Sequence, residues 1–294
     1  MKPSITRHIV LRRLESIDME QISRRMLTRE VSLIAGAMLL YFGVRNLTAG
    51  NADIAFSNAE RISRFEQWAH LDWERGLQAA VIDRDMLVNF ANWVYIWGHW
   101  PVILPTALAL FLWRRERYYV LRNAFFVSGA IGFLFFALLP VAPPRLFDVE
   151  LIDTVTSQSS AYRALQPPGL TNQYAALPSL HVGWNVLLGI VVFTATRSRV
   201  LRFLSVAGPL GMAFAVVATA NHFVVDVGAG IVIVLIGLMV ATSAARPRAA
   251  IVAGLAKDEP HPRGPPPLRH RAPLRQRPRR AARRGASRRP VRRS

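Results

Sequence analysis

Two residues near the start of an apolar stretch, His222 and Asp226, have the side chains and the spacing of a catalytic pair. Four positions apart at the beginning of a helix, they share one face. The aspartate can accept a hydrogen bond from one imidazole nitrogen, which leaves the other nitrogen free to attack or to carry a proton. The same pair also suits a structural role, joining two helices. Because an acidic residue inside an apolar span is expensive, we favour a functional role.

Further polar residues flank two other apolar stretches, in the segments Pro178-Ser179-Leu180-His181 and Pro143-Pro144-Arg145. Proline suits the first turn of a helix, and a helix N-terminus offers free N–H groups and a favourable dipole to a phosphate. A guanidinium fork matches phosphate oxygens. Taken singly, each residue also has a structural interpretation: Ser179 as a helix cap, His181 facing interfacial water, and Arg145 meeting lipid headgroups.

Together these five side chains indicate phosphoryl transfer. Two imidazoles allow one to attack phosphorus while the other protonates the leaving oxygen. Metal binding is the rival chemistry, because His181, His222 and Asp226 could hold a divalent ion. Arg145 would compete with such an ion, and the three segments contain no other carboxylate or histidine. Metal binding is therefore the weaker interpretation.

The elements that must position these residues are apolar stretches of membrane length. Apolar residues make up 52% of the 294-residue chain, and they fall in long blocks. A membrane-spanning helix needs roughly 20 mostly apolar residues. The absence of cysteine excludes a disulfide framework, a thiolate metal site and a cysteine nucleophile. The composition excludes an ordinary soluble domain and predicts six spans, at about 31–48, 87–112, 119–141, 179–196, 201–220 and 223–245.

Two longer segments separate the spans on one side of the membrane. Residues 49–85 contain apolar residues at three- and four-residue steps, with Trp68 and Trp73 among them, which indicates an amphipathic helix on the membrane surface or against the bundle. Residues 142–178 form a proline-containing loop. We therefore expect an all-α polytopic membrane protein, a six-transmembrane-helix bundle over 31–245 with an amphipathic outer helix.

Basic residues indicate the orientation of this bundle. The net charge is +19, and residues 246–294 hold 16 of the 37 Lys and Arg. Residues 1–30 and the loops near 113–122 and 197–202 are also Arg-rich, whereas 49–85 has more acidic than basic residues. The positive-inside rule then places both termini in the cytoplasm and His222 on the extracytoplasmic face of the cell membrane.

The C-terminal segment 246–294 is rich in Arg and Pro and reads as a disordered cytoplasmic tail. Such a tail can contact anionic lipids of the inner leaflet. We expect no specific nucleic-acid partner, because the basic charge belongs to this tail and not to a folded binding domain.

The motifs resemble the type 2 phosphatidic acid phosphatase superfamily. Its three blocks are Lys, six residues, Arg-Pro; then Pro-Ser-x-His; then Ser-Arg, five residues, His, three residues, Asp. Residues 178–181 match the second block, and His222 and Asp226 match the end of the third. Arg145 matches the first block's arginine. The sequence departs from the pattern at three positions, with Leu138 in place of Lys, Leu146 in place of Pro and Val216 in place of Arg.

Three details resemble the inositolphosphotransferase-like branch, which includes inositol phosphorylceramide synthases: Pro-Pro-Arg145, Leu180, and Asn221 before His222. The resemblance covers about residues 90–245. It implies a lipid phosphatase or phosphotransferase without a metal or other cofactor. It leaves open whether water or an alcohol is the acceptor, and whether the substrate is phosphatidate, a polyprenyl phosphate or an inositol phospholipid.

The resemblance also implies residue roles. His222 would be the nucleophile that forms a phosphohistidine, and Asp226 would orient it. His181 would protonate the leaving alkoxide and then activate the acceptor. Arg145, Ser179 and Asn221 would bind the phosphoryl oxygens.

Two other function classes stay open on the sequence alone. A non-enzymatic channel or transporter would also account for six apolar helices, but it predicts polar residues at mid-membrane depth, and here they gather at the ends of the spans. A binding role for the Arg-rich tail predicts function in the isolated tail.

Overall fold

The computed structural model describes residues 24–48, 52–158 and 172–257, with side chains described up to residue 243. The chain divides into two units, residues 1–250 and 251–294, and only 251–257 of the second unit are described. Most of the basic segment predicted at 1–30 and of the tail predicted at 246–294 therefore lies outside the described residues.

Regular structure in the described ranges is entirely helical, apart from a single bridge between Val141 and Ala175. This confirms the all-α prediction for that part of the chain. The helices are α2 Arg24–Thr48, α3 Ala52–Ala69, α4 Glu74–Ile82, α5 Asp85–Trp97, α6 Trp100–Trp113, α7 Arg115–Leu138, α8 Pro144–Phe147, α9 Thr154–Gln158, α11 Leu180–Ala195, α12 Arg199–Ala218 and α13 Val224–Lys257.

Several of these helices are long and apolar enough to cross a membrane. Four pass on length and composition: α2, α7, α12 and the part of α13 that ends at Ser243. A fifth is obtained if the bent pair α5 and α6 counts as one span. The chain thus has the helices of a multi-pass membrane protein. Because α11 has 16 residues, it is about 24 Å long against a hydrocarbon core of about 30 Å, and the six-span count stays a prediction.

The apolar band predicted at 87–112 is not one straight helix. It bends by 42° between α5 and α6. Gly98 lies at the break, and a Cβ there would come within 2.5 Å of the Val94 carbonyl oxygen, so that a side chain does not fit. Pro101 follows in the first turn of α6, where its missing N–H costs no hydrogen bond. This bend places His99 at the break itself.

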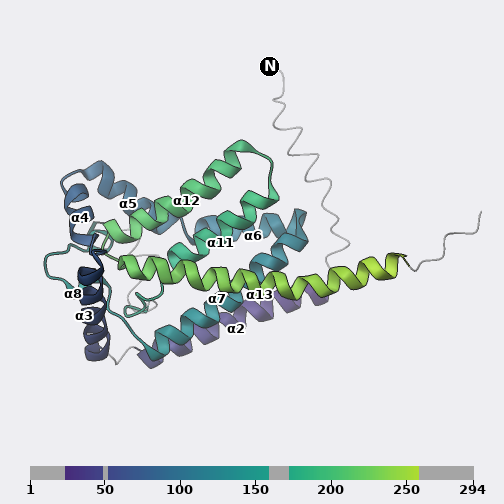
Figure 1. The fold of residues 1–294 in the computed structure, drawn as a ribbon, viewed down its shortest axis with the longest axis horizontal. Helices are drawn as coiled ribbons and strands as arrows, with labels where there is room; N and C mark the ends of the chain where they lie inside the picture. The colour runs from purple at the N-terminus through teal and green to yellow at the C-terminus, as the bar shows by residue number, and fades with distance from the viewer. Residues whose placement is uncertain (1–23, 49–51, 159–171, 258–294) are drawn as a thin grey trace, which may run out of the picture. The chain divides into compact units, whose positions relative to one another are not determined.

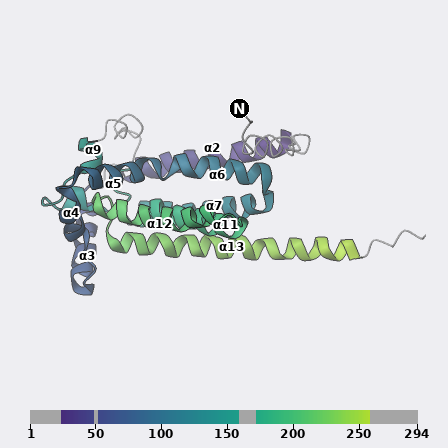
Figure 2. The same ribbon diagram turned by 90° about the horizontal axis from the view of Figure 1, so that it is seen from above.

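Close helix packing brings α11 against α13 and α12. A Cβ at Gly183 would lie 2.6 Å from the carbonyl oxygen of Gly230, and one at Gly189 would lie 2.3 Å from that of Ser205. Small residues let helix backbones approach in this way. The helices α7, α11, α12 and α13 run along one another in both views, while α3 runs across them at one end (Figure 1, Figure 2).

Within the predicted segment 49–85, the described residues form two helices, α3 and α4, where the sequence analysis expected one. The break follows Ala69, and His70 there has a positive φ of 56°. Asn58 of α3 donates to the carbonyl oxygen of Pro140 at 2.9 Å, which fixes the chain where it leaves α7. Trp68 and Trp73 are exposed. A position of this segment on the membrane surface stays a prediction.

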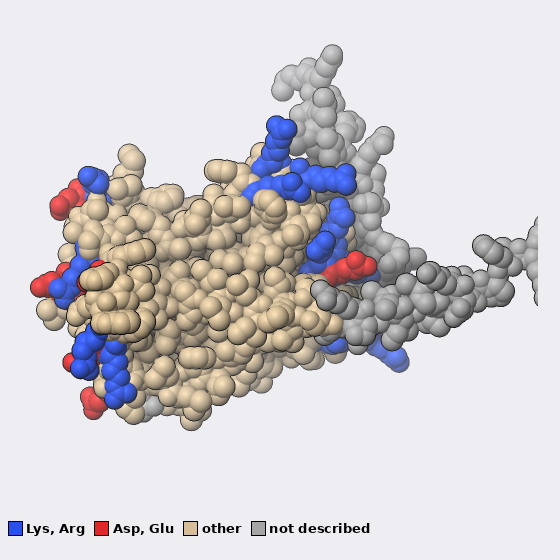
Figure 3. Space-filling model, in the orientation of Figure 1, with Lys and Arg blue, Asp and Glu red and all other residues tan. Residues whose placement is uncertain are grey.

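Charge is segregated along the bundle (Figure 3). Lys and Arg gather at the end that carries the α6–α7 and α11–α12 connections, whereas acidic and basic side chains mix at the end that carries α3 and α4. The visible surface between the two ends shows almost no charge. Large apolar side chains such as Leu39, Leu104 and Phe203 are exposed on the helices of this band, as lipid contact requires.

Candidate active site

Two loop segments, 140–145 and 174–179, are joined by backbone hydrogen bonds near the start of α13. The Val141 N–H donates to the carbonyl oxygen of Tyr174 at 2.9 Å, and the Ala176 N–H donates to that of Val141 at 3.2 Å. Val141 and Ala176 are fully buried or nearly so. The segment that carries Arg145 is thereby tied to the segment that carries Ser179.

The turn at 220–223 and the first turn of α13 are bonded to these two segments. The Arg145 N–H donates to the carbonyl oxygen of Ala220 at 2.9 Å, two residues before His222. The Ser179 N–H donates to the carbonyl oxygen of Asp226, also at 2.9 Å. The three segments that the sequence analysis singled out therefore lie together at one end of the bundle.

His222 is buried, and its imidazole is oriented by a backbone carbonyl. Its Nδ1 lies 2.7 Å from the carbonyl oxygen of Ala176. Because a carbonyl only accepts hydrogen bonds, Nδ1 carries the proton and donates it. In the neutral ring Nε2 then holds the free lone pair, which is the arrangement that a nucleophile or a base needs.

Asp226 is the second group near the same ring nitrogen. Its Oδ2 lies 3.5 Å from Nδ1 of His222 and accepts the Phe223 N–H at 2.8 Å. The other oxygen, Oδ1, has no hydrogen-bond partner among the described residues, and the side chain is fully buried. The sequence analysis named Asp226 alone as the group that orients His222, whereas here Ala176 makes the shorter contact and Asp226 the longer one.

His181, at the start of α11, contacts two aromatic rings. Its centroid is 4.8 Å from that of Tyr95, with the rings nearly parallel, and 4.4 Å from that of His99. The ring of His222 is 5.8 Å away. Asn185 donates through Nδ2 to the carbonyl oxygen of His181 at 2.9 Å, and the same atom lies 3.4 Å from Nδ1 of His99. The imidazoles of His181 and His222 are thus neighbours.

Sequence reasoning missed Tyr95 and His99 as parts of this site. The aromatic residues around them are typical of a membrane interface, and the sequence analysis therefore did not assign these two residues to a site. A histidine inside an apolar span was the available signal. Only the bend between α5 and α6 shows that its ring turns towards α11, where it also lies parallel to that of Trp184 at 5.8 Å.

Ser179 and Asn221 are occupied by contacts within the protein. Ser179 is the N-cap of α11, and its Oγ accepts the Val182 N–H at 3.5 Å. The Asn221 amide donates to Oγ1 of Thr219 at 2.8 Å. Both side chains are buried. These contacts position the two turns, and a direct phosphate contact of either side chain stays a prediction.

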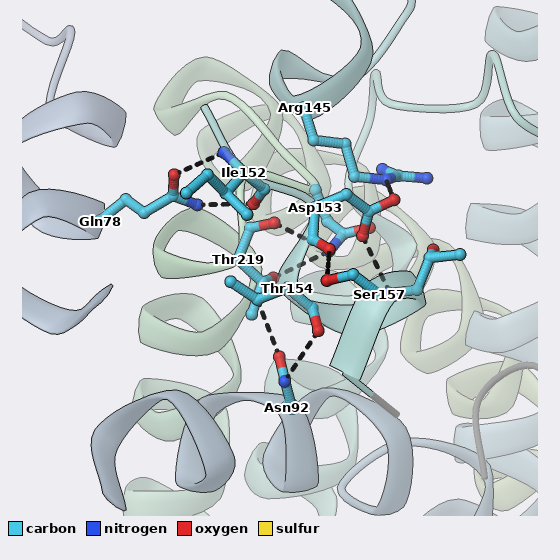
Figure 4. A network of polar contacts seen from close by, with 10 residues as sticks. Gln78, Asn92, Arg145, Ile152, Asp153, Thr154, Ser157 and Thr219 are labelled. Atoms are coloured by element: carbon cyan, nitrogen blue, oxygen red, sulfur yellow. Dashed lines mark hydrogen bonds and ion pairs between the residues drawn. The ribbon is translucent and has the colours of Figure 1, made fainter. Parts of the chain in front are cut away.

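Arg145 is held by one carboxylate of the described residues. Its Nε donates to Oδ2 of Asp153 at 3.1 Å. Within the described residues, no hydrogen bond or ion pair engages its two terminal nitrogens. Asp153 also accepts the Thr156 N–H at 2.9 Å, which fixes the carboxylate (Figure 4).

A polar network extends from Asp153 to the neighbouring helices (Figure 4). Gln78 of α4 accepts the Ile152 N–H at 2.8 Å and donates to the carbonyl oxygen of Ile152 at 3.0 Å. Asn92 of α5 exchanges two hydrogen bonds with Thr154, of 3.0 and 3.1 Å. Since buried polar groups are stable when fully bonded, this network anchors the loop that holds Arg145.

Among the residues that the structure describes, no group of three or more His, Cys, Asp or Glu side chains is arranged to hold a metal ion. Independence from metals stays a prediction that requires an assay.

Comparison with known families gives one match. A family model described as the PAP2 superfamily matches residues 60–240, which is more than half of the chain and includes Arg145, His181, His222 and Asp226. No curated protein and no solved structure matches the chain.

Proposed function

Because the chain belongs to the PAP2 superfamily, we propose that it is an integral membrane enzyme that hydrolyses or transfers a phosphoryl group on a phosphorylated lipid. The observation that carries the proposal is the pair of neighbouring imidazoles. His222 has its Nδ1 proton committed to the carbonyl oxygen of Ala176, and the ring of His181 lies 5.8 Å away.

In the proposed reaction His222 is the nucleophile. Its Nε2 attacks phosphorus, the bond from phosphorus to the lipid oxygen breaks, and the electron pair stays on that oxygen. His181, as an imidazolium, gives its proton to the leaving oxygen. In the second half, neutral His181 takes a proton from water or an alcohol, whose oxygen attacks phosphorus. The bond between nitrogen and phosphorus then breaks and frees His222.

The surrounding groups balance the charge that develops. The ring of His222 becomes positive when it carries the phosphoryl group, and Oδ2 of Asp226 at 3.5 Å offsets that charge. The terminal nitrogens of Arg145 bind the phosphoryl oxygens. Ser179 and Asn221 contribute by holding the two turns, and the mechanism uses no metal.

Within the superfamily we place the chain in the inositolphosphotransferase-like branch. Support comes from the motif form Pro143-Pro144-Arg145, from Leu180 between Ser179 and His181, and from Asn221 before the nucleophile. We propose that the acceptor is then an alcohol. Any group that is still attached to the phosphoryl group is transferred with it.

The proposed orientation places the site on the extracytoplasmic face of the cell membrane and both termini in the cytoplasm. The charge distribution supports it, because the Arg-rich α6–α7 and α11–α12 connections lie at the end opposite α3 and α4 (Figure 3). The membrane domain is proposed to span 31–245, followed by a cytoplasmic tail that contacts anionic lipids.

Trapping of the phosphoenzyme tests the mechanism. Purified protein is incubated with a lipid that carries a radiolabelled phosphate, quenched in alkali and assayed for acid-labile label. We expect His222→Ala to abolish both label and turnover. His70→Asn is the matched control, because His70 is an exposed histidine with positive φ that asparagine tolerates. Label that persists in His222→Ala would show that another residue is the nucleophile.

A substrate panel tests the branch. Phosphatidate, a polyprenyl phosphate and an inositol phospholipid are supplied with and without an alcohol acceptor, and free phosphate and new phospholipid are measured separately. Transfer to the acceptor supports the inositolphosphotransferase-like branch. Release of phosphate at the same rate with and without acceptor would make the protein a lipid phosphatase.

A further inference from the structure

The first turn of α13, which follows His222, is capped by carboxyl groups from three different helices. The Phe223 N–H donates to Oδ2 of Asp226 at 2.8 Å. The Val224 N–H donates to Oε1 of Glu74 at 2.8 Å, and the Val225 N–H to Oε1 of Glu66 at 2.7 Å. The N–H groups at the start of a helix lack partners within the helix, and carboxyl oxygens there are favourable. These N–H groups therefore bind protein carboxyls and are not free for a substrate phosphate.

Glu66 and Glu74 lie on α3 and α4, far from α13 in the sequence. Their exposed fractions are 1% and 5%, although acidic residues are seldom so buried. The two carboxyl groups accept from N–H groups of adjacent residues, Val224 and Val225, so they are close neighbours in a buried place. Two buried carboxylates side by side repel each other, so this placement favours one proton on the pair.

Burial also favours that proton. Loss of solvation raises the pKa of Glu66 to about 9, opposed by the hydrogen bond from Val225 and reinforced by the negative charges of Glu74 and Asp226. Burial likewise raises the pKa of Glu74. At neutral pH one proton stays on the pair, and we place it on Glu66.

No other charged group around the pair among the described residues supplies a positive charge that would neutralise a second carboxylate in place of the proton. Asp226 faces it from α13, and Asp72, Arg75 and Asp148 line a solvent-open hollow beside it. Arg75 is committed to Asp148 at 2.6 Å and to Glu150 at 2.9 Å. Among the described residues, the lining of this hollow includes no other Lys or Arg. The hollow gives water, and hence hydroxide, access to the pair.

From these contacts we infer that Glu66 and Glu74 are positioning residues of the phosphoryl-transfer site, a carboxyl pair that holds the start of α13, and with it His222, only while the pair retains one proton. This inference rests on the proposed function. Loss of the proton places three carboxylates around one helix turn, where like charges repel. The turn then moves, and the His222 ring leaves the position that Ala176 defines.

The pH profile of kcat tests the inference. In the wild-type protein we expect turnover to fall with a midpoint near pH 9, as Glu66 loses its proton. Glu66→Ala should lower kcat at pH 7 by at least about tenfold, which equals about 1.4 kcal/mol in the barrier. Glu66→Gln should keep most of it, because the neutral amide can still accept from Val225 and places no second negative charge beside Glu74. This variant should lack the fall near pH 9.

Glu60→Gln is the matched control. Glu60 lies on α3, is exposed, and pairs only with Arg64 in the described structure. This variant should keep the wild-type profile. A fall near pH 9 that is unchanged in Glu66→Gln, or a wild-type protein without such a fall, would overturn the inference.

An infrared titration keeps this test independent of the proposed reaction. Without substrate, the C=O band of a buried protonated carboxylic acid should disappear with a midpoint near pH 9 and should be missing from Glu66→Gln. If the band titrates as expected but no lipid phosphate is turned over, the proposed function fails and the carboxyl pair stands. Absence of the band from the wild-type protein refutes the pair itself.

Discussion

Replacing Gly230 of α13 with alanine should disable the site through a single methyl group. A Cβ at this position would lie 2.2 Å from the carbonyl oxygen of Ser179, 3.0 Å from its carbonyl carbon and 3.4 Å from its nitrogen. All three are backbone atoms, and the carbonyl accepts the Gly183 N–H at 3.0 Å in the first turn of α11. The clash cannot be relieved by turning a flexible side chain.

The magnitude follows from these distances. A contact of ordinary length requires α11 and α13 to separate by about 1 Å, and such a displacement of reacting groups costs roughly 100-fold in rate. Overpacking of a well-packed contact costs about 1–3 kcal/mol of stability, and a backbone clash belongs at the upper end of that range. The displaced residues include His181, so that its distance to His222 increases.

Gly228→Ala is the matched control. Gly228 lies two residues away on the same helix, and a Cβ there would meet nothing within 4 Å. Alanine in a helix interior is favoured over glycine by roughly 0.5–1 kcal/mol, so this variant should be at least as stable as the wild type.

The assay is turnover of a phosphorylated lipid by purified protein in bilayer discs, with thermal unfolding of the same samples. We expect Gly230→Ala to lose activity while its unfolding remains cooperative, and Gly228→Ala to retain activity. Wild-type turnover and stability in Gly230→Ala would refute the argument that the approach of α11 to α13 sets the distance between the histidines.

The remaining predictions concern topology, metal, the phosphate contact and the tail. A reporter fused after residue 245 should be cytoplasmic and one inserted near residue 155 should be outside; finding both on one side would separate the site from its proposed compartment. Turnover should survive a chelator, and activity lost on chelation and restored by one specific ion would exclude the metal-free mechanism. Arg145→Lys should lower kcat/KM by roughly 10- to 100-fold because lysine lacks the planar fork, as steady-state kinetics will measure; an unchanged kcat/KM would remove Arg145 from the site. Removal of residues 258–294 should leave kcat per folded molecule within about tenfold, or about 1.4 kcal/mol, because every proposed site residue precedes residue 227; loss of turnover in correctly folded and oriented protein would require the tail in the mechanism.

Features with a local sequence signature could be predicted from the sequence. High hydropathy over about twenty residues indicates a span, because each spanning helix must present apolar side chains across the hydrocarbon core. The family motifs place Arg145, His181 and His222 at the ends of such spans, and the structure brings these residues together through the backbone bonds of Ala220 and Ala176. The all-helical fold and the superfamily follow from these signals.

Features that depend on packing between distant segments could not be predicted. The contact that orients His222 comes from the backbone carbonyl group of Ala176. Every residue has such a group, so the sequence does not reveal which one makes the contact. Glu66 and Glu74 look like the polar face of an amphipathic segment, since nothing near them in the sequence reveals that α13 will cover them. The bend that turns His99 towards His181 depends on Gly98 and Pro101 within an otherwise continuous apolar run.

The capping of α13 by early segments also sets the order in which the enzyme can mature. The two glutamates precede their partners by 150 and 159 positions, and a ribosome delivers the N-terminal part of a chain first. Until α13 enters the membrane, a nascent chain carries the receiving carboxyls, Arg145 and His181, but neither the proposed nucleophile nor the N–H groups that the carboxyls bind. If the proposed mechanism holds, competence for phosphoryl transfer arises in one late step of biogenesis, and a chain released before residue 222 should lack turnover.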